Sequence, residues 1–165
     1  MTSTGASVAS QTNFDKGVEF RLKGNASFKE GDYTEALRQY YFAILHLRTV
    51  GGNKEKKIFE EKANEQLVMI YNNMSNVYSK QNKWERVIEY ATMVTALDPK
   101  NKKATFRLGQ AYLRQGKADK AKPLLEDVLK MDPNDALVKS EIARLEEDEQ
   151  HMENREKNIY RKMFS

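Results

Sequence analysis

Residues 102–133 read KKATFRLGQAYLRQGKADKAKPLLEDVLKMDP. Gly109 allows a first helix to approach a second one closely, and Gly116 permits the positive φ that a tight turn needs. Pro133 ends the second helix, because proline cannot continue it. The stretch therefore predicts one helix–turn–helix unit.

The same pattern occurs 34 residues earlier, where LDP at 97–99 corresponds to MDP at 131–133. The equivalent positions there are Ser75, Tyr78, Asn82, Val87, Val94 and Pro99. A third copy is marked by Gly24, Gly31, Ala36, Tyr40 and Ala43. This spacing resembles that of the tetratricopeptide repeat, in which each unit leaves an apolar face for its neighbour to cover. The resemblance implies an all-α fold of three helix–turn–helix repeats in a right-handed superhelix.

The repeats divide the chain into three parts. We expect a three-repeat domain over 14–135, with repeats at about 17–50, 68–101 and 102–135. The first two repeats are 51 residues apart, which places an insertion of about 17 residues at about 51–67. Gly51 and Gly52 break the chain there, and the residues from Lys54 onward favour a helix. We therefore expect a loop followed by a helix from about Lys56 to Lys80.

The two ends of the chain differ in character. Residues 1–13 are rich in Ser, Thr and Ala without periodicity, which predicts a disordered leader before a first helix at about 14–30. Residues 136–165 carry a sparse apolar face and predict a long C-terminal helix. Its first half should cover the flank of the third repeat, and its second half should project into solvent.

Composition excludes several classes of protein. The 165 residues include no Cys, which excludes disulfides and thiol catalysis and suits a cytoplasmic location. No membrane span, secretory signal or metal-ligand spacing occurs, and no nucleophile–base pair or phosphate loop can be assembled, so we expect neither an enzyme nor a cofactor. The net charge of +4 comes from cations interleaved with acids, which argues against nucleic-acid binding.

The first helices of stacked repeats line a concave groove, where equivalent positions converge. Five polar residues are candidates for that face: Arg21, Asn25, Asn73, Lys103 and Arg107. Three cations and two amides in one groove favour an anion with several carboxylate oxygens. A peptide C-terminus beside an acidic side chain has that chemistry. Asn72 is predicted to lie on the surface instead.

The segments RLKGN, YNNMSNVY and KATFRLG resemble the carboxylate clamp of tetratricopeptide cochaperones, which bind the C-terminal Glu-Glu-Val-Asp tail of Hsp90 and Hsp70. The resemblance implies that Asn25, Asn73 and Lys103 hold the terminal carboxylate region. It assigns Arg21 and Arg107 to the peptide backbone and the acidic side chains. The implied function is a non-catalytic cochaperone-type adaptor.

Other family features refine this expectation. Phe28 would line an apolar subsite for the tail. The family more often has Lys at the position of Arg21, and Asn76 replaces a small apolar residue, which leaves the choice between Hsp90 and Hsp70 open. The chain is most similar to the repeat region of immunophilins and to the tetratricopeptide repeat protein 9 group. Only about 14 residues precede the repeats here, so we expect a binding module without the immunophilin isomerase domain.

Three alternatives stay open. The second hypothesis for the groove is a scaffold that holds another protein or an internal acidic segment without chaperones. The terminal segment REKNIYRKMF combines basic and apolar residues, which suits calmodulin, an acidic partner or a membrane surface. A dimer contact through the same helix is a further alternative.

Overall fold

The structure is a computed structural model that describes residues 3–50 and 56–165. Seven helices and no strand occur in these two ranges. In chain order they are α1 (Ser3–Lys29), α2 (Tyr33–Arg48), α3 (Lys56–Lys80), α4 (Trp84–Leu97), α5 (Lys102–Arg114), α6 (Ala118–Met131) and α7 (Ala136–Met163). The prediction of an all-α chain is confirmed for the described residues.

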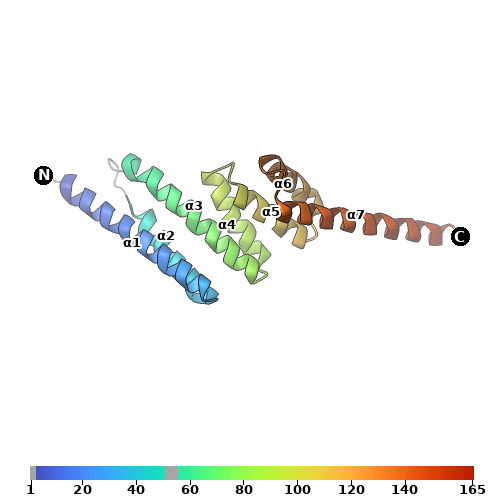
Figure 1. The fold of residues 1–165 in the computed structure, drawn as a ribbon, viewed down its shortest axis with the longest axis horizontal. Helices are drawn as coiled ribbons and strands as arrows, with labels where there is room; N and C mark the ends of the chain where they lie inside the picture. Colours follow the sequence, from blue (N-terminus) through green and yellow to red (C-terminus); the bar gives the residue numbers. More distant parts are fainter. Residues whose placement is uncertain (1–2, 51–55) are drawn as a thin grey trace.

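The helices form three hairpins that stack one after another, and α7 follows the last of them (Figure 1). The pairs α1–α2, α3–α4 and α5–α6 make the most extensive contacts, while α2–α3 and α4–α5 join neighbouring hairpins. Each hairpin thus covers the next one, as the repeat pattern predicts.

Each hairpin turn contains one residue with positive φ. Gly31 has a φ of 79° and Gly116 a φ of 74°. The second turn has Asn82 at the equivalent position, with a φ of 57°. Asparagine tolerates this region better than other residues with a Cβ, because its short polar side chain can bond locally. The three turns therefore share the same backbone geometry, although two of them have glycine and one has asparagine at this position.

Close contact within a hairpin depends on small residues in its first helix. A Cβ added to Gly24 would lie 2.5 Å from the Tyr40 ring, and one added to Gly109 would lie 2.8 Å from Leu125. In the second hairpin, Ser75 stands at the glycine position and the smaller Ala91 at the position of Tyr40. A smaller residue in the first helix of a hairpin is therefore paired with a larger residue in the second helix, and a larger one with a smaller one.

The beginning of α1 corrects one prediction. Residues 3–13 were expected to be disordered, but they continue α1 as helix. Tertiary contacts explain the difference. Ser10 is buried, Phe14 packs against the core, and Gly17 allows Leu47 of α2 to approach closely. Packing therefore outweighs the modest helix propensity of the Ser- and Thr-rich segment.

The predicted helix from Lys56 to Lys80 is confirmed by α3, which has those bounds. Its N-terminal extension packs inward, since Phe59 and Ala63 are buried. The loop expected at Gly51 and Gly52 lies outside the described residues.

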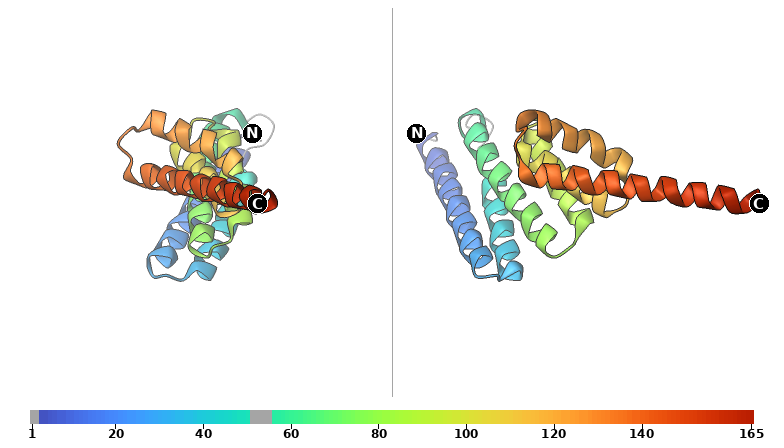
Figure 2. Two further views of the ribbon diagram at one scale, coloured as in Figure 1. Left: turned by 90° about the vertical axis from the view of Figure 1, so that its right-hand side faces the viewer. Right: turned by 45° about the vertical axis from the view of Figure 1, so that its right-hand side comes forward.

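The last helix has two different halves. Val138, Glu141 and Leu145 are buried near its start, whereas residues 151–165 are exposed and extend away from the array (Figure 2). Both parts of the prediction for this helix are therefore confirmed. No helix in the described ranges is long and apolar enough to cross a bilayer.

A buried ion pair fastens α7 to α5. The guanidinium of Arg114 donates to both carboxylate oxygens of Glu141, at 2.9 and 2.7 Å, and Gln110 donates to the same carboxylate at 3.1 Å. Burial acts to raise the pKa of Glu141, but these hydrogen bonds outweigh it and leave the pKa below its ordinary value. The pair therefore holds a charged carboxylate against the third hairpin.

Candidate functional site

The five predicted polar residues come together along α1, α3 and α5. They line three adjoining hollows that all share Asn73. The first hollow, of about 340 Å³, also contains Lys103 and Arg107. The second contains Arg21, Asn25 and Lys103. The shared lining joins the hollows into one groove built from the first helix of each hairpin.

A short hydrogen-bond chain holds the two asparagines. Asn73 Nδ2 donates to Asn25 Oδ1 at 2.9 Å, and the hydroxyl of Tyr40 donates to the same oxygen at 2.7 Å. Burial raises the pKa of Tyr40 to about 12, so its hydroxyl remains a donor at neutral pH. Because Asn25 Oδ1 accepts both bonds, the amide nitrogen of Asn25 is the end left for a ligand.

Arg107 is held from α3. Its Nη2 donates to Asn76 Oδ1 at 2.7 Å, and its Nη1 donates to Ser79 Oγ at 3.3 Å. Burial lowers the pKa of Arg107 from its ordinary value, but an arginine stays charged in proteins. The groove therefore contains a partly desolvated positive charge whose orientation is fixed by neutral partners.

The other two cations are held more loosely. Arg21 Nε donates to Gln66 Oε1 at 2.8 Å, and Lys103 is exposed at the groove wall. Within the described residues, Arg21, Lys103 and Arg107 form no ion pair with a carboxylate. Their charge is therefore available to an anion from solution.

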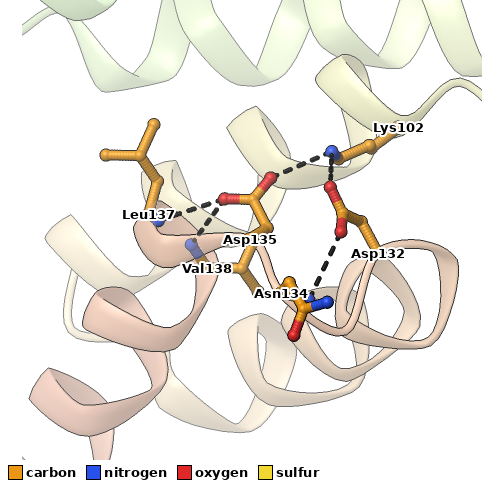
Figure 3. Close-up of polar contacts among 6 residues, drawn as sticks. All are labelled: Lys102, Asp132, Asn134, Asp135, Leu137 and Val138. Carbon is orange, nitrogen blue, oxygen red and sulfur yellow. Dashed lines mark hydrogen bonds and ion pairs between the residues drawn. The ribbon is translucent and has the colours of Figure 1, made fainter.

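The neighbouring Lys102 behaves differently, although it lines the same hollows. Its Nζ lies 2.8 Å from Asp132 Oδ2 and 2.9 Å from Asp135 Oδ2 (Figure 3). Asp135 also accepts hydrogen bonds from the backbone N–H groups of Leu137 and Val138, which caps α7. The hydrogen bonds from Lys102 hold the pKa of both carboxyls below their ordinary range. Lys102 therefore joins α5 to the α6–α7 junction, whereas Lys103 has no carboxylate partner in the described part of the chain.

Phe28 lines the third of these hollows. It is half-buried and shares this hollow with Asn25 and Tyr40. Its ring centroid is 5.6 Å from that of Tyr33. Phe28 therefore gives this hollow an aromatic wall, as Phe106 does for the first hollow.

The prediction for Asn72 is wrong. This residue was expected on the surface, but it lines the first two hollows and its Nδ2 donates to Asn101 Oδ1 at 3.2 Å. Asn101 in turn caps α5 by accepting from the backbone N–H of Ala104. The sequence contains one signal for this placement of Asn72. Its partner Asn101 stands directly before the helix that carries Lys103, which is a helix-capping position. Asn76 is a further groove residue and contacts Arg107, and Gln66 contacts Arg21.

The described residues offer no metal site, since no three His, Asp or Glu side chains in those ranges gather closely enough to hold an ion. The groove instead presents amides and cations, which suit a carboxylate ligand.

Comparisons with known proteins agree with this architecture. A family profile described as tetratricopeptide repeat matches residues 78–145. Among curated proteins, the human peptidyl-prolyl cis-trans isomerase FKBP4 is 27% identical over 157 residues, which cover 94% of this chain and 33% of that protein. The chain thus spans about a third of the length of this relative.

Solved structures share the fold. The C-terminal repeat domain of a putative FK506-binding protein from Plasmodium falciparum has a TM-score of 0.79 and 20% identity, covering 88% of this chain and 95% of that one. The first such domain of Spaghetti (RPAP3), bound to the HSP90 peptide SRMEEVD, has a TM-score of 0.66 and 22% identity, with 82% and 94% covered. The second domain of human RPAP3, in complex with the HSP70 peptide SGPTIEEVD, has a TM-score of 0.62 and 25% identity, with 83% and 98% covered.

Proposed function

We propose that this chain, which has the tetratricopeptide-repeat fold and matches the repeat profile over residues 78–145, is a non-catalytic adaptor that docks the acidic C-terminal tail of Hsp90 or Hsp70 in its groove. The tail ends in Glu-Glu-Val-Asp, so it offers a terminal carboxylate and acidic side chains within a few residues. The absence of cysteine in the sequence suits the reducing cytoplasm, which we propose as the compartment.

The observation that carries this proposal is that three converging cations have no carboxylate partner among the residues that the structure describes. Arg21, Lys103 and Arg107 come from two different helices and share one groove with Asn73. A buried or half-buried cation without a partner is costly, and an incoming carboxylate would relieve that cost. The groove is therefore suited to an anionic ligand rather than to a neutral one.

Each residue would have a distinct part. Asn25, Asn73 and Lys103 would hold the terminal carboxylate. The amide nitrogen of Asn25, the second N–H of the Asn73 amide and the ammonium of Lys103 are donors at the shared hollow. Arg107 and Arg21 would contact the peptide backbone and acidic side chains at either side, where a planar guanidinium allows bidentate contacts.

Phe28 would receive an apolar side chain of the tail. It lies beyond Asn25 and Asn73 along the groove, next to the ring of Tyr33. A peptide anchored by its terminus would pass over this aromatic wall with its upstream residues.

The relatives support the same class of ligand. The Spaghetti and human RPAP3 domains are bound to peptides that end in EEVD. Their similarity to this chain covers more than four fifths of it.

Calorimetric titration with SRMEEVD, beside the same peptide amidated at its C-terminus, tests the proposal. We expect micromolar binding of the free acid that amidation removes and added salt weakens, because paired charges supply much of the attraction. SGPTIEEVD in a parallel titration measures the preference between the two chaperones. Equal binding of acid and amide, or no binding of either, would contradict the proposal and favour a scaffold for another protein.

A further inference from the structure

The apolar stripe that fixes α7 to the array continues beyond it. Val138 and Leu145 are each 1% exposed, and Leu145 packs with the core residues of α5 and α6. The next residues at the same seven-residue interval are Met152, which is 62% exposed, and Ile159, which is 53% exposed. Positions seven apart lie on the same side of a helix. One face of α7 is therefore buried in its first half and uncovered in its second.

Further large apolar residues widen the uncovered part. Tyr160 and Phe164 are exposed, and their ring centroids lie 4.6 Å apart. Met163, four residues after Ile159, is exposed on the same side. We call these five residues the distal stripe: Met152, Ile159, Tyr160, Met163 and Phe164. Such a concentration of exposed apolar side chains marks an interaction surface.

The charges beside the distal stripe are arranged along the helix axis. Residues 146–149 are Glu-Glu-Asp-Glu, whereas Arg155, Lys157, Arg161 and Lys162 make the terminal part basic with Glu156 among them. A parallel pair of such helices would place acids against acids and cations against cations. An antiparallel pair places each acidic segment beside the basic segment of the other helix. The helix is thus complementary to itself in one orientation only.

We propose that the distal half of α7 pairs antiparallel with that of a second copy of this chain, about a two-fold axis near Arg155 and Glu156. In this register Met152 packs against the partner's Ile159, and Glu149 lies beside the partner's Lys162. The interface is isologous, so every contact occurs twice. The overlap comprises residues 146–165, about 20 residues or roughly 30 Å of helix.

The shape of the molecule permits this pairing. The distal half of α7 projects away from the three hairpins (Figure 2), so a helix can lie along it without meeting them. In the antiparallel arrangement the two arrays lie at opposite ends of the paired helices. The groove on α1, α3 and α5 is not involved, and the pairing is independent of the proposed peptide binding.

Sedimentation equilibrium of the full chain over a wide concentration range tests the pairing. We expect a mass that rises toward twice the 19.1 kDa of one chain. Ile159→Lys should shift the protein to a single-chain mass, because it places a charge in the centre of the stripe. Asn154→Lys adds the same charge on the opposite side of the helix and should leave the larger mass unchanged.

Disulfide trapping tests the orientation, because the chain has no cysteine of its own. Glu156→Cys lies next to the axis and should form a covalent dimer on oxidation, whereas Met163→Cys should remain mostly single chains. In a parallel pair both variants would be trapped equally. A single-chain mass for the unaltered protein at every concentration, or equal trapping of the two variants, would overturn the proposal.

Discussion

Asn76 Oδ1 accepts a hydrogen bond of 2.7 Å from Nη2 of Arg107, and this bond links α3 to α5 across the groove. The two residues lie in the same hollow as Lys103. A small apolar residue at position 76, as is usual in the clamp family, would leave that guanidinium nitrogen without this acceptor. Asn76 therefore fixes the orientation of the cation before any ligand arrives.

We expect Asn76→Ala to weaken binding of SRMEEVD a few-fold. Arg107 would lose its preferred orientation, and immobilising a long side chain on binding costs about 0.5–1.5 kcal/mol. Ser79→Ala is the matched control, since it removes the longer bond of 3.3 Å to the same guanidinium and should have a smaller effect. Calorimetry measures both, and unchanged or tighter binding by Asn76→Ala would show that the bond does not prepare the site.

Arg107→Ala should weaken the same peptide by about tenfold to a hundredfold, because a hydrogen bond to a charged group contributes about 1.5–3 kcal/mol. Arg107→Lys should recover only part of the loss, since an ammonium lacks the planar fork. Arg38→Ala removes an exposed arginine of α2 and should bind normally. Circular dichroism would show whether the fold is kept, and normal binding by a folded Arg107→Ala would disprove its part in the site.

Gly24→Ala should destabilise the protein by about 1–3 kcal/mol, the usual effect of overpacking, because the new methyl group would meet the Tyr40 ring at 2.5 Å. In a Tyr40→Ala background the same change should cost much less, since the second hairpin already combines Ser75 with Ala91. Urea unfolding of the four proteins gives this coupling as a double-mutant cycle. If the destabilising effects of Gly24→Ala and Tyr40→Ala were additive, the close approach of the Tyr40 ring would not depend on the glycine.

The Arg114–Glu141 pair should make stability sensitive to acid. The pKa of Glu141 lies below its ordinary value of 4.5 in the folded protein, so the stabilisation is fully present above about pH 4.5 and is lost as the pH falls through the lowered pKa. Glu141→Gln should cost about 1–3 kcal/mol at neutral pH and much less in acid. Thermal unfolding of both proteins across this pH range measures the loss of stability. A loss that is the same at every pH would contradict the role given to the Arg114–Glu141 pair.

Periodicity explains why so much of the groove was predictable. Asn73 and Arg107 are one repeat length apart and occupy equivalent positions on α3 and α5, which a regular array brings together wherever the helices form. The bounds of α3 followed from the glycine pair before it and from its helix-forming residues. These features depend on local sequence and on the repeat length alone.

The remaining features depend on tertiary contacts that spacing does not encode. Helix α1 begins at Ser3, before the predicted start at Phe14, and Ser10 in this extension is buried, which propensity does not anticipate. Asn72 is one residue from Asn73, and its role depends on a side-chain bond to Asn101 in the next hairpin. The choice of Lys103 rather than Lys102 as the cation for a ligand depends on where Asp132 and Asp135 lie. Such partners are separated by about 30 residues and are fixed only by the folded chain.

The contact between Gly24 and Tyr40 has a consequence for engineering. The absent side chain at Gly24 lets the Tyr40 ring approach α1, and the Tyr40 hydroxyl then reaches Asn25 from the core side. Anyone who grafts this groove onto an idealised repeat array would have to transfer Gly24, Asn25 and Tyr40 as one set. Replacing the buried tyrosine by a consensus aliphatic residue would preserve a well-packed hairpin and yet leave the grafted asparagine without one of its two supports.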